Sequence, residues 1–105
     1  MIVSPNYNDA VPAYITALIN RLTSLFRVNQ LSGKQLFAVV VSGYSGGDLV
    51  AMQLIGALNM NKPFILPAHF CLFETANDAG EIKRAPDAQK LALEFAQNML
   101  KQIKK

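Results

Sequence analysis

The sequence has few of the residues that mark several common kinds of site. Its 105 residues include one cysteine, Cys71, one histidine, His69, and no tryptophan. A single cysteine forms no disulfide within the chain, and one cysteine with one histidine does not make a conventional zinc site. Charged residues make up only 16% of the chain and hydrophobic residues 51%, which excludes a disordered chain and indicates one packed domain.

Long apolar runs and nucleotide-binding glycine motifs are also lacking. No run approaches the roughly 18–20 apolar residues that span a bilayer, so no membrane association is predicted. The chain opens with Met-Ile-Val-Ser-Pro, which has no basic segment or long apolar segment of a secretory signal. The lack of a secretory signal and the single cysteine together favour a cytoplasmic protein. Neither a P-loop nor a G-x-G-x-x-G fingerprint occurs, so hydrolysis of nucleoside triphosphates is not predicted.

The net charge of +3 suggests a nucleic-acid partner, but the distribution of the charge argues against one. Three of the ten basic residues, Lys101, Lys104 and Lys105, lie in the last five positions, where the end of a helix favours cations. The remaining basic residues are scattered and form no stripe with interleaved aromatics. We therefore predict no nucleic-acid binding.

Three short apolar segments have the composition of β-strands. They lie at residues 1–4, at residues 36–41, and from residue 64 as far as residue 73. The middle segment, Leu-Phe-Ala-Val-Val-Val, is a continuous apolar run of the kind carried by a strand that is buried on both faces. These segments predict three strands of a parallel sheet.

Helical periodicity separates the strand segments. Helices are predicted over residues 11–26, over residues 49–60 and from about residues 86–87 onward. Asn8 or Asp9 is the expected N-cap of the first helix, and Gly56 is expected to permit close approach of a neighbour to the second. The order strand, helix, strand, helix, strand, helix (βαβαβα) predicts an α/β fold, a three-layer parallel sheet with helices on both faces.

In such sheets ligands bind at the carboxyl ends of the strands. Three loops are expected to converge there: residues 4–9, residues 42–48 and residues 67–70. The second loop, Ser-Gly-Tyr-Ser-Gly-Gly-Asp, is the richest in glycine. Its glycines either bring the backbone close to an anion or planar ring, or they make a tight turn from strand to helix.

The first loop, Ser-Pro-Asn-Tyr-Asn, leaves a similar choice open. Tyr7 and Asn8 offer a ring face and an amide to a ligand, or they belong to a turn with an exposed tyrosine. Ser42, Ser45 and His69 do not indicate a serine hydrolase, because the loop lacks the G-x-S-x-G elbow. His69 is expected at a strand edge, and Cys71 is expected to be a small buried apolar residue.

Taken in order, these motifs resemble the NAD(P)H-dependent FMN reductase branch of the flavodoxin-like family. Members carry Ser/Thr-Pro-x-Tyr-Asn after their third strand, which residues 4–8 match, and then a helix like that at residues 11–21. A Gly-Lys pair precedes their fourth strand, as at Gly33 and Lys34, and Ser-Gly-x-x-Gly-Gly follows it, as at residues 42–47. The resemblance covers essentially the whole chain but only the C-terminal half of the family's domain.

The resemblance implies an enzyme that reduces a quinone, azo compound or free flavin by hydride transfer from NAD(P)H through bound FMN. It implies that one side of the FMN isoalloxazine is lined by Pro5, Asn6, Tyr7 and Asn8. It implies that the other edge of the ring is contacted by Ser42, Gly43, Tyr44, Gly46 and Gly47. No catalytic acid or base is assigned, because the flavin carries the chemistry. No metal ligand is assigned either, since the chain has one histidine and one cysteine.

The chain departs from the family in two respects. Asn20 stands where the family has the aspartate of an Asp-Arg pair. The resemblance also implies that residues 1–105 form one flavodoxin-like domain that lacks the family's first two strands and the loop that binds the FMN phosphate. An unpaired sheet edge and exposed apolar surface are then expected, and they predict a homo-oligomer.

Two alternatives to a flavin reductase stay open. One is a non-catalytic remnant or oligomeric interaction module that keeps the sheet but binds no flavin. The other is an anion- or nucleotide-binding module that uses the glycine loop.

Overall fold

The computed structural model describes residues 1–76, 80–84 and 87–104, and strands and helices alternate along them. The strands are β1 (Ile2–Pro5), β2 (Ala38–Ser42) and β3 (Cys71–Thr75). The helices are α1 (Ala13–Arg21), α2 (Thr23–Arg27), α3 (Gly47–Leu54), the π-helix η1 (Ile55–Met60), α4 (Glu81–Arg84) and α5 (Ala88–Ile103). Pro86, near the predicted start of the last helix, and Lys105, one of the C-terminal lysines, lie outside the described residues.

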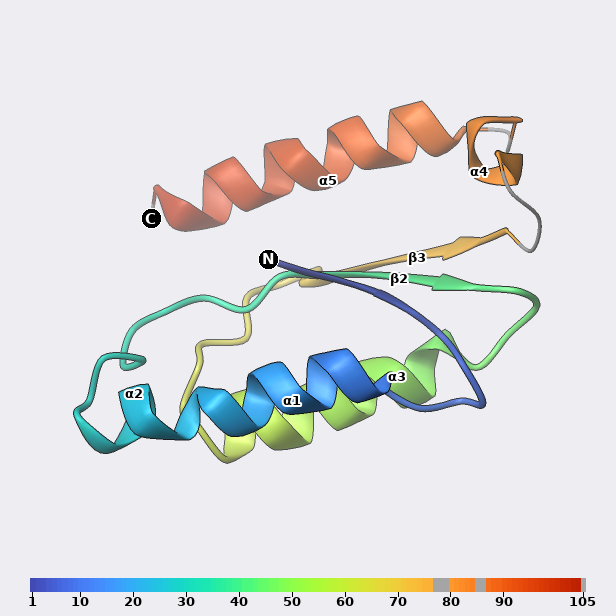
Figure 1. Cartoon of the computed structure of the whole chain (residues 1–105). Coiled ribbons are helices and arrows are strands. Elements are labelled where there is room, and N and C mark those ends of the chain that lie inside the picture. Colours follow the sequence, from blue (N-terminus) through green and yellow to red (C-terminus); the bar gives the residue numbers. More distant parts are fainter. Residues whose placement is uncertain (77–79, 85–86, 105) are drawn as a thin grey trace.

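The three strands form one parallel sheet in the order β1-β2-β3. Ser4 pairs with Val40 in the register of β1 and β2, and Val40 pairs with Phe73 in the register of β2 and β3. Figure 1 shows α1 and α3 on one face of the sheet and α5 on the other. The prediction of a three-layer α/β fold is therefore confirmed, and the strands' carboxyl ends lie together at one edge.

The core lies between the sheet and the layer of α1 and α3. Alternate residues of β2, Ala38 and Val40, are completely buried on this face, because successive side chains of a strand point to opposite sides. They pack in a cluster with buried apolar residues from the loop before β2 and from the helices: Ile15, Leu36, Val50, Leu54 and Leu58. This layer holds the carboxyl edge of the sheet in place.

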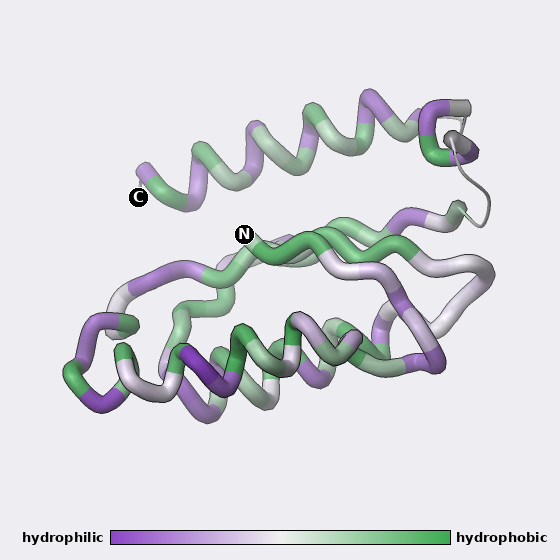
Figure 2. The backbone as a smooth tube through the Cα atoms, in the orientation of Figure 1, coloured by the Kyte–Doolittle hydropathy of each residue, from purple (hydrophilic) through white to green (hydrophobic). Residues whose placement is uncertain are grey.

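The opposite face is covered less completely. None of the described residues of α5 is buried, and Leu93 and Ile103 on this helix are about 60% and 58% exposed. The helix is held to the sheet side by Phe95, whose ring meets the buried ring of Phe37 edge-to-face with centroids 6.2 Å apart. Figure 2 shows the alternation of apolar and polar residues along this helix. A groove of about 350 Å³ remains beside Met1, and its lining is apolar except for Glu74.

Several helix predictions were wrong in detail. The first helix is divided at Leu22, and its N-cap is Pro12 rather than Asn8 or Asp9. Asn8 and Asp9 instead form a turn of their own before the helix, described below. The second helix changes at Ile55 from α to π geometry. A Cβ at Gly56 would meet nothing within 4 Å, so this glycine does not serve a close helix contact.

The third strand begins later than predicted. Residue Ile65 makes only an isolated bridge to Gln35, and β3 itself starts at Cys71. Pro67 has no N–H to donate to a ladder, and His69 has a φ of +53°, which turns the chain before the strand. Residues 67–70 therefore lie at the amino end of β3, and the expectation that they join the other two loops at the carboxyl edge was wrong.

Candidate functional site

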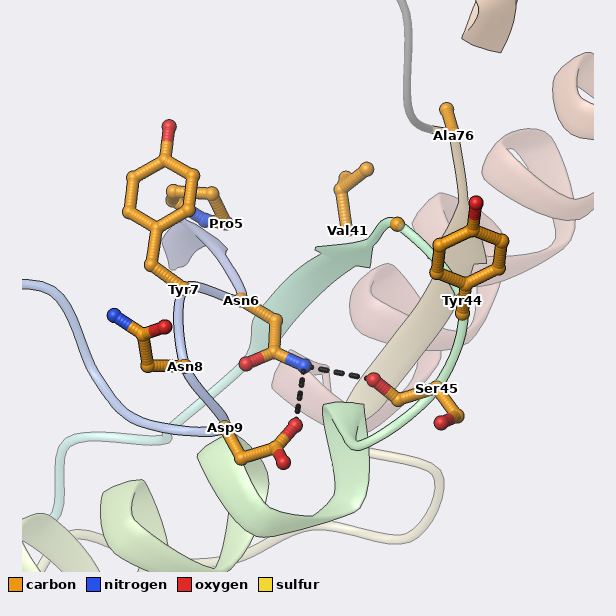
Figure 3. A pocket seen from close by; sticks show the side chains of 10 residues that line it. Pro5, Asn6, Tyr7, Asn8, Asp9, Val41, Tyr44, Ser45 and Ala76 are labelled. Carbon is orange, nitrogen blue, oxygen red and sulfur yellow. Dashed lines mark hydrogen bonds between the residues drawn. The ribbon is translucent and has the colours of Figure 1, made fainter.

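The two remaining loops meet at the carboxyl edge of the sheet and enclose a cleft of about 480 Å³. One loop follows β1 and the other follows β2, and the chain just after β3 completes the wall (Figure 3). The described residues that line the cleft are Pro5, Asn6, Tyr7, Asn8, Asp9, Val41, Gly43, Tyr44, Ser45 and Ala76. The volume falls in the range of small-molecule sites, about 300–1,000 Å³.

The loop after β1 is built around a tight turn. Asn8 and Asp9 have φ values of +57° and +55°, and the N–H of Ala10 donates to the carbonyl of Tyr7 at 3.2 Å. Two successive central residues with positive φ are typical of a type I′ turn, and Asn and Asp tolerate that conformation best after glycine. The local sequence thus accounts for the turn that carries Tyr7 at its start.

The loop after β2 brings its backbone close to the first loop. Gly46 has a φ of +86°, and a Cβ at this position would overlap Asp9 Oδ1. A Cβ at Gly47 would lie 3.0 Å from Phe73 Cδ1 and 3.1 Å from Ser42 Oγ. The structure therefore explains why both positions are glycine, since Gly46 adopts a left-handed conformation and Gly47 permits close packing.

Asn6 connects the two loops. Its Nδ2 group donates to the carbonyl of Ser45 at 2.8 Å and lies 3.3 Å from both Ser42 Oγ and Asp9 Oδ1. Its backbone N–H donates to the carbonyl of Val41 at 2.8 Å. The other side-chain atom, Oδ1, is buried and has no hydrogen-bond partner among the described residues. A buried acceptor of this kind gains stability from a donor supplied by a ligand.

Two tyrosines flank the cleft. Figure 3 shows Tyr7 from the first loop and Tyr44 from the second on opposite sides, with Asn6 between them. Tyr7 and Tyr44 are 61% and 86% exposed. A large aromatic ring that stays exposed contributes little to the stability of the fold. Aromatic faces bind flat apolar ligands by stacking. The two rings, with the unpaired acceptor of Asn6, fit a planar ring that carries an N–H donor, and the isoalloxazine of FMN is such a ring.

The structure brings most of the predicted flavin-binding residues to this cleft. Those that line it are Pro5, Asn6, Tyr7, Asn8, Gly43 and Tyr44. Ser42 and Gly47 line an adjoining hollow of about 230 Å³ instead, and Gly46 lies against Asp9 and lines neither hollow. The contact of these residues with a flavin stays a prediction.

Sequence reasoning missed four lining residues: Asp9, Val41, Ser45 and Ala76. The rule that ligands bind at the carboxyl ends of parallel strands could have predicted Val41 and Ala76, since both lie at strand ends. Asp9 and Ser45 lie inside the loops at residues 4–9 and 42–48, but the resemblance implies no role for either. The sequence places Asp9 in the first loop, but the only individual role that it predicts for Asp9 is that of a helix cap.

The isolated histidine and cysteine lie away from the cleft. His69 and Cys71 line a separate hollow between the amino end of β3 and α5. Burial raises the pKa of the Cys71 thiol from its ordinary value of 9.0 to about 11, which makes this half-buried group unreactive at neutral pH. Within the part of the chain that the structure describes, no group of three or more His, Cys, Asp or Glu residues is placed to hold a metal ion.

The fold and cleft define the class of the protein. Three parallel strands covered by helices, with a cleft at their carboxyl ends, make an α/β protein that is consistent with part of a flavodoxin-like fold. The family model for NADPH-dependent FMN reductase matches residues 1–78, and the chain belongs to this family. Membership implies FMN and NAD(P)H, and it makes the protein a flavin-associated, NAD(P)H-dependent reductase at the level of the family.

The family match includes all three strands and both loops of the cleft. Comparison with curated proteins and with solved structures found no match. Across residues 1–76, 80–84 and 87–104, no helix is both long enough and apolar enough to cross a membrane.

Proposed function

We propose that this protein binds FMN at the cleft between the two loops and transfers electrons from NAD(P)H to a small-molecule acceptor. The chemistry that bound FMN supplies is hydride acceptance from a nicotinamide followed by reduction of a quinone, an azo compound or a free flavin. The observation that carries the proposal is the buried, unpaired Oδ1 of Asn6 in a cleft flanked by Tyr7 and Tyr44. The family assignment of residues 1–78 supports the same ligand.

In this proposal the chain's own residues bind and orient the ring. Tyr7 and Tyr44 provide aromatic contact, and Asn6 Oδ1 accepts a hydrogen bond from a ring N–H. The hydrogen bond of 2.8 Å from Asn6 Nδ2 to the carbonyl of Ser45 fixes the direction of that acceptor. No acid or base of the chain is needed for hydride transfer, and we assign none.

Flavin fluorescence tests the proposal directly. Titration of FMN with the purified protein is expected to quench the emission saturably and to shift the absorption spectrum. Asn6→Ala removes both the acceptor and the contacts between the loops, so it is expected to weaken FMN binding by about tenfold or more. Asn20→Ala removes an exposed amide from α1 and serves as the matched control.

The control is expected to bind FMN as the unaltered protein does. Absence of saturable quenching by the unaltered protein would contradict flavin binding and favour a non-catalytic module. Equal FMN affinity for the unaltered protein and Asn6→Ala would place the flavin elsewhere on the chain.

A further inference from the structure

Among the described residues that line the two hollows at the carboxyl edge of the sheet, the charged ones are acidic, although the chain carries a net charge of +3. Among the described residues that line the cleft, Asp9 is charged and none is Lys, Arg or His. The adjoining hollow shares Tyr44 and Ser45 with the cleft, and its charged lining residues are Asp48 and Glu74. The walls of the cleft and of the adjoining hollow therefore carry negative charge.

Asp9 also occupies the place at which an anion would approach the glycine loop. Its carboxylate lies against Gly46, the N-cap of α3, so that even a Cβ there would overlap Asp9 Oδ1. The start of a helix attracts negative charge, and here a carboxylate of the chain itself already supplies that charge. The position of Asp9 depends on the turn after β1 and on Asn6 Nδ2, 3.3 Å from its Oδ1.

We infer that Asp9 disfavours an anionic group at the start of α3 and so determines which part of a flavin this cleft recognises. This inference rests on the proposed function, because it concerns how the same cleft takes a flavin. The carboxylate keeps phosphate away from the start of α3, so the residues of this cleft recognise the uncharged ring.

FMN and riboflavin test the inference because they share the ring and differ in the phosphate. The unaltered protein is expected to bind riboflavin at least as tightly as FMN at low ionic strength. Asp9→Asn is expected to raise FMN affinity by roughly threefold to tenfold, and to change riboflavin affinity by less than about twofold. Added salt is expected to reduce the difference between the two proteins, since it screens exposed charges.

Asp9→Asn is a conservative change at this position. The φ of Asp9 is +55°, a conformation that Asn tolerates as well as Asp, and the amide keeps an Oδ1 acceptor toward Asn6. Glu94→Gln is the matched control, because it removes one exposed carboxylate from α5 beside the separate hollow of His69 and Cys71. The control is expected to leave both flavin affinities unchanged.

The outcomes separate this inference from the proposed function. If both flavins bind and their affinity ratio is the same with Asp9 and with Asn at that position, the inference is overturned while the proposed function stands. A strong FMN preference in the unaltered protein, or an equal gain in FMN affinity from Glu94→Gln, also overturns it. If neither flavin binds, the proposed function fails and the inference fails with it.

Discussion

The carboxylate of Asp9 lies directly against the backbone of Gly46, which leaves no room for a side chain at residue 46. The contact joins the turn after β1 to the loop after β2. The shape of the cleft therefore depends on Gly46. A substitution there tests the packing of the two loops, and a substitution at another glycine with positive φ tests the backbone conformation alone.

Gly46→Ala is expected to destabilise the protein more than Gly33→Ala. Both glycines have positive φ, +86° and +81°, so both substitutions cost about 1 kcal/mol of backbone strain. A Cβ at Gly33 would meet nothing within 4 Å, whereas a Cβ at Gly46 would overlap Asp9 Oδ1. We expect the clash to add about 1–2 kcal/mol to the loss in free energy of unfolding, measured by urea denaturation. Equal losses in the free energy of unfolding for the two variants would contradict this prediction, because they would show that the two loops move apart to accept a Cβ at residue 46.

Tyr7→Ala and Tyr44→Ala are each expected to weaken flavin binding by about threefold to tenfold, because an aromatic contact contributes roughly 0.5–1.5 kcal/mol. The side chains are 61% and 86% exposed, so the free energy of unfolding is expected to change little. Tyr14→Ala, at a 58% exposed position on α1, is the control. Fluorescence titration that gives all three variants the same FMN affinity as the unaltered protein would exclude the tyrosines from the site.

The contribution of Cys71 to stability is expected to fall as the pH rises. Burial raises the pKa of the folded thiol to about 11, above its ordinary value of 9.0, so the unfolded chain releases this proton first. The stabilisation is complete below pH 9 and is lost as the pH rises toward 11. Urea denaturation between pH 8 and 10.5 gives the free energy of unfolding of the unaltered protein and of Cys71→Ala. The difference between these two free energies is expected to fall as the pH rises. A difference that is independent of pH would contradict the raised pKa.

Self-association is expected through the exposed apolar surface beside β1. Val3 and Met1 are 56% and 70% exposed, and they adjoin the apolar groove under α5 and the free edge of the sheet. Val3→Lys is expected to shift sedimentation toward a smaller species, because a charge on an edge strand opposes pairing. Thr16→Lys adds the same charge on exposed α1 as a control. A single monomeric species of the unaltered protein at micromolar concentration would contradict this prediction.

The sequence by itself determined the layer order and the general place of the site. A continuous apolar run ending in Val39-Val40-Val41 predicts a strand buried on both faces, and the helical spacing on either side predicts the parallel connection. Because parallel strands end at one edge, the segments after β1 and β2 had to lie near each other. Their proline, tyrosine and glycine residues carried the resemblance to the family that the match over residues 1–78 then confirmed.

Only the tertiary structure decided how those loops touch and where β3 begins. The contact of Asp9 with Gly46 and the hydrogen bond from Asn6 Nδ2 to the carbonyl of Ser45 join segments far apart in the chain, and no local preference specifies such contacts. The apolar residues from 64 onward are strand-like in composition, but pairing with β2 starts only at Cys71. Pro67 has no N–H to donate to a ladder and His69 has a φ of +53°, so the chain turns away after the isolated bridge at Ile65 and pairs again only from Cys71.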